Sequence, residues 1–274
     1  MIRDITIGQY YPAKSPLHKL DPRVKLVSTL LYLISLFLFR SIPGYLVATF
    51  FLVWIVRLSK VPFGHIVKGL RPIIMLLMIT VIFNLFLTRG ETVLLHVWVL
   101  TVTAEGLRNA IYMAIRLVYL IIGSSLMTFT TTPNELTDGI EALLNPLNKI
   151  HVPVHEVAMM MSIALRFIPI LLEETDKIMK AQLARGADFE SGNIIQRAKA
   201  MIPILVPLFV SAFRRANDLA MAMEARCYRG GEGRTKMKPL HYHALDKKAY
   251  VIVVVYLAAV VLIGRYVPFH IWIF

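Results

Sequence analysis

Cysteine is nearly absent from this chain, since Cys227 is the single cysteine among 274 residues. One thiol excludes an intrachain disulfide. Acidic residues are also few, because 17 Asp and Glu stand against 30 Lys and Arg, a formal net charge of +13. The basic residues are spread along the chain and do not form one basic domain with interleaved aromatic residues. This distribution argues against a nucleic-acid-binding protein.

Sequence motifs for bound cofactors are missing as well. The phosphate-binding pattern G-x-x-x-x-G-K-[ST] does not occur, and the segment 229–236 mimics it only loosely, without the flanking strand and helix. His151 and His155 are four residues apart, but Pro153 breaks the helical face between them and no Cys or carboxylate cluster completes a ligand set. We therefore expect no cofactor and no metal site. The first 25 residues are polar and basic, so we also expect no cleavable signal peptide.

Apolar residues, by contrast, make up 57% of the chain, and charged residues only 17%. Soluble domains carry about 45 to 50% apolar residues, so this composition is typical of an integral membrane protein. Long apolar runs predict about five transmembrane helices, and the expected fold class is an all-α, polytopic membrane protein with additional long amphipathic cytoplasmic helices. The predicted spans are 26–39, 42–56, 72–87, 107–129 and 249–264.

Lys and Arg indicate which side of the membrane each segment occupies, because cytoplasmic segments carry an excess of them. Sixteen of the thirty fall between Thr131 and Lys248. Keeping that region on one side leaves only Arg40, Arg89, Arg108 and Arg265 outside. We therefore predict a cytoplasmic N-terminal segment (1–25), four spans (26–130), a cytoplasmic coupling region (131–248) and a last span (249–274). The N-terminus is then inside and the C-terminus outside.

Two long amphipathic helices are predicted within the region 131–248. Apolar positions recur at helical spacing from about Pro153 to Arg185, and a stretch of equal length runs from Ile194 to Arg226. A helix of the first length measures about 48 Å, so we expect both to lie along the membrane surface and to cross. Residues 188–193 form the expected turn between them. Prolines within the helices should bend them, and these are Pro169, Pro203 and Pro207.

Opposite charges occupy equivalent positions in these two predicted helices. An offset of 41 residues superposes Glu173 and Glu174 on Arg214 and Arg215. One hypothesis is that these charges face each other and fix the crossing angle. The alternative is a solvated polar face, since exposed ion pairs contribute only about 0 to 1 kcal/mol. Seven methionines in the same region indicate either a surface that repacks against several partners or the filling of an irregular crossing.

Two similar tripeptides end these two stretches, Ala184-Arg185-Gly186 and Ala225-Arg226-Cys227. An arginine between small residues at a helix end presents its guanidinium clear of bulky neighbours, where it can bond carboxylates or carbonyls of a partner. Contact with phospholipid headgroups is the alternative. A positive φ at the helix end is less favourable for Cys227 than for a glycine.

These motifs resemble the transmembrane T component of energy-coupling factor transporters, the bacterial importers of vitamins and transition-metal ions. The segment Ser15–Leu26 is also similar to the opening segment of that family. The first tripeptide matches the family's Ala-Arg-Gly motif fully, whereas the second has Cys227 in place of glycine. The resemblance covers most of the chain.

The resemblance implies a non-catalytic coupling subunit in the bacterial plasma membrane. Arg185 and Arg226 would each dock into one of two ATP-binding cassette ATPase subunits, which bind the ATP, while Ala184, Gly186, Ala225 and Cys227 provide clearance. A small substrate-binding membrane protein, the S component, would be the third kind of partner, besides the lipid bilayer. The sequence does not name the substrate, and we expect a vitamin-type module shared among several S components.

A membrane enzyme acting on lipid or isoprenoid substrates at the cytoplasmic face is the alternative function. Its candidate residues would be Glu173, Glu174 and Asp176. They lie within four positions on one helix and point to different sides, and no second acidic motif supplies the partners of a two-metal site. A secondary transporter is disfavoured because the spans lack carboxylates and no inverted repeat is detectable.

Overall fold

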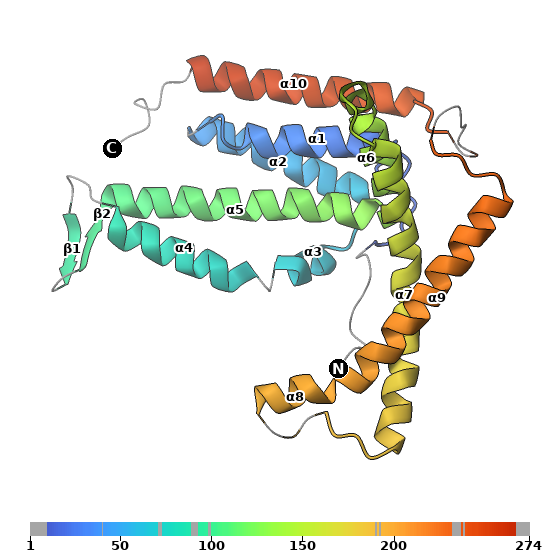
Figure 1. Cartoon of the computed structure of the whole chain (residues 1–274). Helices are drawn as coiled ribbons and strands as arrows, with labels where there is room; N and C mark the ends of the chain where they lie inside the picture. Colours follow the sequence, from blue (N-terminus) through green and yellow to red (C-terminus); the bar gives the residue numbers. More distant parts are fainter. Residues whose placement is uncertain are drawn as a thin grey trace. The chain divides into compact units, whose positions relative to one another are not determined.

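The computed structural model of the chain describes residues 10–39, 41–70, 73–88, 93–97, 100–189, 191, 193–231, 237 and 239–266. Helices dominate these residues (Figure 1), which confirms the predicted all-α class. The α-helices are α1 (Pro22–Ser35), α2 (Ile42–Ser59), α3 (Phe63–Leu70), α4 (Ile74–Leu87), α5 (Ala104–Thr130), α6 (Pro133–Leu144), α7 (Val154–Ala184), α8 (Ile194–Ala200), α9 (Ile202–Ala225) and α10 (Ala244–Tyr266).

Two smaller elements complete the described part of the chain. A 3-10 helix, η2 (Asn145–Ile150), follows α6, and an antiparallel hairpin precedes α5. The hairpin strands are β1 (Val93–Val97) and β2 (Leu100–Thr103), a pairing that the sequence analysis did not predict. Residues 1–9, Arg40 and Arg89, all of which enter the predicted membrane orientation, lie outside the described residues.

The described residues form two compact units. One, called here the bundle unit, holds those between 10 and 139 and between 240 and 266. The other, called the crossing unit, holds those between 140 and 239. These units are defined by packing, so the division of the chain into cytoplasmic and membrane segments stays a prediction.

Helices α1 and α10 run parallel in the bundle unit. The main-chain N–H of Asp21, just before α1, donates to the Asp246 carboxylate near the start of α10 at 2.9 Å. At the other end of α1, the hydroxyls of Ser35 and Tyr256 are 2.9 Å apart. Helix α5 runs the opposite way, because the Lys25 ammonium donates to the carbonyl of its last residue, Thr130, at 2.8 Å. The bundle therefore has one end where α1 and α10 begin and α5 finishes.

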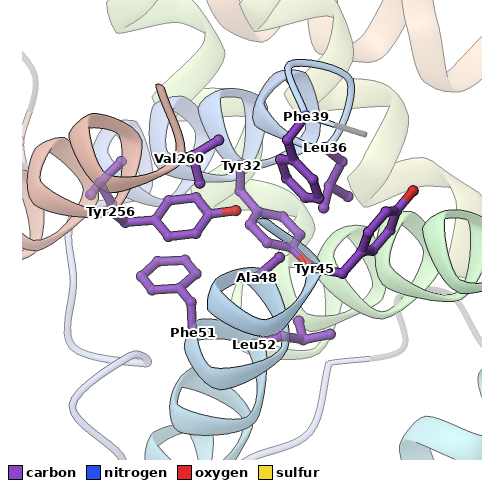
Figure 2. Packing of buried hydrophobic residues seen from close by; sticks show 10 residues of the cluster. Tyr32, Leu36, Phe39, Tyr45, Ala48, Phe51, Leu52, Tyr256 and Val260 are labelled. Atoms are coloured by element: carbon purple, nitrogen blue, oxygen red, sulfur yellow. The ribbon is translucent and has the colours of Figure 1, made fainter. Parts of the chain in front are cut away.

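An aromatic cluster forms the core of the bundle unit (Figure 2). The rings of Phe51 and Tyr256 stack with centroids 4.0 Å apart, and the Tyr32 ring lies about equally far from both, at 6.0 and 6.1 Å. Offset and tilted ring pairs of this kind each contribute about 0.5–1.5 kcal/mol beyond the burial of their area. The cluster thus joins α1, α2 and α10, elements that are far apart in the sequence.

Helix α1 begins at Pro22, four residues before the predicted span 26–39. Asp21 is the N-cap residue, and its carboxylate accepts from the Arg23 main-chain N–H at 2.9 Å, while Pro22 occupies the first turn. A proline there is favourable because its missing N–H would have no helical partner. The Arg23 side chain also donates to Asp21 at 2.8 Å and lies over the Tyr242 ring, 4.0 Å from its centroid. The start of α1 is therefore held by both hydrogen bonds and an ion pair.

Five described helical segments are long and apolar enough to cross a membrane, which confirms a multi-pass membrane protein. By length and composition they differ from the predicted five. Helices α1 and α4 have 14 residues each, fewer than the roughly 20 that a bilayer core requires. Two segments that were predicted to lie at the membrane surface are long and apolar enough to span it, and they take the places of α1 and α4 among the five. The five segments are Ile42–Ser59, Ala104–Thr130, Val154–Ala184, Ile195–Ala225 and Ala244–Tyr266.

One predicted helix of the crossing unit is divided in two. The stretch 194–226 forms α8 and α9, which are separated at Met201. Pro203, which was predicted to interrupt and bend this helix, follows the break directly and lies in the first turn of α9, where a proline replaces no helical hydrogen bond. Pro169 and Pro207 do lie inside α7 and α9. The predicted turn 188–193 lies partly outside the described residues.

Candidate docking site at two helix ends

The first arginine motif forms the C-terminal cap of α7. The helix ends at Ala184, Arg185 is the cap residue, and Gly186 adopts a left-handed conformation with φ of +86°. The Gly186 N–H donates to the Leu183 carbonyl and the Ala187 N–H donates to the Gln182 carbonyl, both at 3.0 Å. These two bonds define a Schellman motif, which satisfies carbonyls that the helix end would otherwise leave free.

The second arginine motif repeats this geometry at the end of α9. Arg226 is the cap residue, and Cys227 is left-handed with φ of +57°. The Cys227 N–H donates to the Glu224 carbonyl at 2.8 Å, and the Tyr228 N–H donates to the Met223 carbonyl at 3.0 Å. The chain therefore adopts the same cap without glycine, although a left-handed conformation costs a residue with a Cβ about 1–2 kcal/mol.

Both motifs are open to the surroundings. All six motif residues are exposed, and a Cβ added to Gly186 would meet no atom within 4 Å. Among the described residues, neither Arg185 nor Arg226 takes part in an ion pair. The structure thus presents two guanidinium groups, each on a hydrogen-bonded helix cap and each with space around it for a partner.

The two capped helices cross in an antiparallel sense. The Arg215 guanidinium of α9 lies 3.4 Å from the Glu174 carboxylate of α7, and the Gln182 side chain near the end of α7 donates to the Pro203 carbonyl near the start of α9 at 3.4 Å. Figure 1 shows one crossing between these helices. The two arginine caps therefore lie on opposite sides of it.

The distances from the crossing to the two caps are equal along the helices. Arg185 follows Glu174 by 11 residues, and Arg226 follows Arg215 by 11 residues. At 1.5 Å per residue, each cap is about 16 Å along its helix from the ion pair. Glu174 and Arg215, which form this ion pair, are 41 residues apart, the same spacing that separates the two arginine motifs.

Only one of the two superposed charge pairs is in contact. Glu173 and Arg214 form no ion pair among the described residues, whereas Glu174 and Arg215 do. The side chains of that pair are 28% and 40% exposed, so the pair contributes about 0 to 1 kcal/mol. Whether it fixes the crossing angle stays a hypothesis.

Helices α7 and α9 leave most of their apolar side chains uncovered. Buried residues in α7 are Val154 and Ala158, and in α9 only Ile204 is buried. Exposed apolar surface of this size requires lipid or a protein partner. The exposed large side chains include four of the methionines singled out in the sequence, together with Phe209 and Phe213, and these methionines are Met160, Met161, Met201 and Met221.

One of the two histidines considered as metal ligands has another contact. The His155 Nδ1 atom is 3.0 Å from a Glu141 carboxylate oxygen. In the described part of the chain, no three His, Cys, Asp or Glu side chains come together as a metal site would require. The expectation that the chain binds no metal stays a prediction.

Two contacts that define the crossing and the bundle could not be predicted from the sequence. The bond from Gln182 to Pro203 shows the antiparallel crossing, and the bond from Asp21 to Asp246 shows the parallel course of α1 and α10. Each joins elements distant in the sequence, and no local pattern marks these residues. A fixed spacing between equivalent positions, such as the 41 residues that relate Glu174 to Arg215, is the kind of sequence feature that can indicate such pairs.

The fold and the two caps define a helical multi-pass membrane protein that presents two exposed arginines on crossed helices. A family model described as the cobalt transport protein CbiQ matches residues 13–237. The chain is also 61% identical to the energy-coupling factor transporter transmembrane protein EcfT of Clostridium kluyveri, over 88% of this chain and 89% of the relative. It therefore belongs to the CbiQ/EcfT family, whose EcfT members are transmembrane components of energy-coupling factor transporters.

Other relatives agree with this assignment. EcfT of Ruminiclostridium cellulolyticum is 56% identical over 96% of this chain and 98% of the relative. EcfT of Bacillus subtilis is 48% identical over 93% of this chain and 96% of the relative. These proteins carry the name of a transporter component, so the chain is a non-catalytic membrane subunit. A lipid-modifying enzyme built on Glu173, Glu174 and Asp176 is not supported.

Proposed function

We propose that this subunit couples ATP hydrolysis by two partner ATPases to the reorientation of a substrate-binding membrane protein. The observation that carries the proposal is the pair of exposed arginine caps that share one hydrogen-bond pattern and lie at equal distances along their helices from one crossing. A site that repeats in this way fits two copies of one kind of partner, or two closely similar partners. The ATP is bound by these partners and not by the chain itself.

Each arginine cap would enter a groove on one ATPase. A guanidinium can donate two parallel hydrogen bonds to a carboxylate or to adjacent carbonyls. Ala184 and Gly186 beside Arg185, and Ala225 and Cys227 beside Arg226, let the groove close around the helix end. The Schellman bonds keep each cap in one conformation, so little conformational freedom is lost when the partner binds.

The crossed helices would transmit motion as levers. When the ATPases close on ATP, they move the two caps, and each cap is about 16 Å along its helix from the Glu174–Arg215 contact. A helix moves as a rigid body over its length, and packed helices slide or rotate against each other in many conformational transitions. The movement would reach a partner that covers the apolar faces of α7 and α9.

The partner on those faces would be the small substrate-binding membrane protein. The apolar side chains left exposed on α7 and α9 form a surface of the kind that buries against another apolar protein. The flexible thioethers of Met160, Met161, Met201 and Met221 would let that surface repack against several such proteins. The substrate class would be a vitamin or a transition-metal ion, recognised by the binding protein.

The bundle unit supports an orientation with the N-terminus in the cytoplasm and the C-terminus outside. Helix α5 finishes at Thr130 and α10 begins at Ala244, and both residues lie at the end where α1 begins. Positive charge concentrates on the segments that meet there, as it does on cytoplasmic segments. The residues are Arg23, Lys25, Arg57, Lys60, Lys247 and Lys248.

Isolation of the chain from its native membrane tests the proposal. In mild detergent, the wild-type chain should bring along two nucleotide-binding subunits and a small membrane protein, identified by mass spectrometry. In vesicles that carry this complex with the ATPases on the inside, the ligand of the small membrane protein should be imported only when ATP is enclosed in the vesicles. Recovery of the chain without any ATPase would overturn the proposal.

A further inference from the structure

The bundle unit contains an apolar cavity of about 280 Å³. It lies between α1, α2, α5 and α10, at the end of the bundle where α1 and α10 begin. Carbon atoms form nearly all of its wall, with contributions from Leu20, Phe51, Trp54, Leu126 and Ile252. A cavity of about 280 Å³ holds part of one acyl chain and is too small for a partner helix.

Two lysines line the polar end of this cavity. Lys25 is 93% buried, and its ammonium donates to the carbonyls of His18 at 3.2 Å and Thr130 at 2.8 Å. An ammonium has three donors, so one remains for a ligand. Lys248 is exposed at the start of α10. No carboxylate is among the lining residues, although Glu135, Asp21 and Asp246 lie near Lys25.

Two hydroxyl groups lie deeper along the same face of α1. The Ser28 and Tyr32 oxygen atoms are buried and have no hydrogen-bond partner among the described residues. Both residues line the cavity, and they follow Lys25 at spacings of three and seven, which places all three on one face of the helix. A buried hydroxyl without a partner costs about 1–3 kcal/mol, so an acceptor within the cavity would be stabilising.

We propose that this cavity binds an anionic phospholipid. Its phosphate lies against Lys25 and Lys248, its ester carbonyls accept hydrogen bonds from Ser28 and Tyr32, and the first part of one acyl chain lies against the apolar wall. The order of charge, hydroxyl and carbon along the cavity matches the order of phosphate, ester and hydrocarbon in such a lipid. Basic pockets between membrane helices are known to hold anionic headgroups. This inference does not depend on the docking of ATPases.

Native mass spectrometry of the full chain in detergent tests the site, with dioleoyl phosphatidylglycerol and dioleoyl phosphatidylcholine as probes. Phosphatidylglycerol should be retained as one bound molecule and preferred over phosphatidylcholine. Lys248→Gln should weaken its retention about fivefold, because one cation near an anionic headgroup contributes that much. The matched control Lys247→Gln alters an exposed neighbour that does not line the cavity, and it should retain the lipid as the wild type does.

A second pair of variants tests the acyl-chain part of the site. Ile252→Trp fills the cavity and should abolish retention, whereas Val251→Trp adds the same ring at a residue that is 62% exposed and outside the lining. Equal retention by both tryptophan variants, or equal retention of the two lipids, would overturn the proposal. So would loss of labelling by a photoactivatable phosphatidylglycerol when the complex assembles, because a protein partner would then cover the cavity in place of the lipid.

Discussion

The Asp246 carboxylate accepts a hydrogen bond of 2.9 Å from the main-chain N–H of Asp21, although 225 residues separate the two. Asp246 is fully buried, and its second oxygen accepts from the His243 main-chain N–H at 2.7 Å. One side chain therefore completes the first turn of α10 and ties the first helix to the last. The contact therefore joins the two parts of the bundle unit that precede and follow the crossing unit in the sequence.

We predict that Asp246→Ala lowers the stability of the chain. The substitution leaves two main-chain N–H groups without their charged acceptor, and a loss of about 3 kcal/mol is expected for such groups. The apparent melting temperature in detergent should fall, while Lys247→Ala at the exposed neighbouring position should leave it unchanged. Equal melting temperatures for the two variants would show that the link contributes little.

Acid should weaken the start of α1. Burial alone would raise the pKa of Asp21, but hydrogen bonds from the Arg23 side chain and main chain, together with the Arg23 charge, outweigh it and hold the pKa below its ordinary value of 3.8. A lowered pKa in the folded chain means that the ionised carboxylate contributes stability above pH 3.8, and that this contribution is lost as pH falls through the folded pKa.

The comparison of wild type with Asp21→Asn checks this pH dependence. The difference in melting temperature should be constant near neutral pH and should shrink as pH falls below 3.8. Asp218→Asn replaces an exposed carboxylate in the crossing unit and serves as the control. A wild-type advantage that persists unchanged to the lowest pH would contradict the assignment to Asp21.

Cys227→Gly should stabilise the α9 cap. Cys227 has φ of +57°, which glycine adopts without a steric penalty, so a gain of about 1 kcal/mol is expected. Gly186→Ala at the equivalent position of α7, with φ of +86°, should lose about as much. Cys227→Ala separates the thiol from the backbone effect and should show no gain. Thermal melting of the three variants provides the measurement.

The crossing contact is tested by reversing its charges. Glu174→Arg and Arg215→Glu should each lower the melting temperature slightly, and the double variant should recover, with a coupling energy of about 0.5 kcal/mol for this partly exposed pair. Glu173→Arg with Arg214→Glu is the matched control, because these residues form no ion pair among the described ones. The same coupling in both pairs would mean that the contact is not specific.

Local sequence predicted the helix ends of the candidate site, because the determinants of a Schellman cap lie within six consecutive residues. Ala184-Arg185-Gly186 therefore predicted the end of α7. The resemblance of Ala225-Arg226-Cys227 to the same motif predicted the end of α9. Local sequence marked Pro203 as a bend but did not specify two separate helices divided at Met201, since Pro203 is compatible both with a bent helix and with the first turn of a new one.

Contacts between distant elements were harder to predict. The offset between the motifs aligned Glu174 with Arg215, but it aligned Glu173 with Arg214 equally well, and only the direction of each side chain around its helix separates them. The link from Asp21 to Asp246 and the cavity beside Lys25 depend on how α1, α5 and α10 pack. No periodicity in the sequence specifies that packing.

Quantitative copurification of the ATPases with arginine variants tests the central claim most directly. Wild type, Arg185→Glu, Arg226→Glu and the double variant are compared with Arg197→Glu, an exposed arginine of α8 outside both motifs. Reversal of a docked charge should weaken its contact at least about thirtyfold, so each single variant should lose one ATPase and the double variant both. Full retention of both ATPases by the double variant, at the level of Arg197→Glu, would contradict the account.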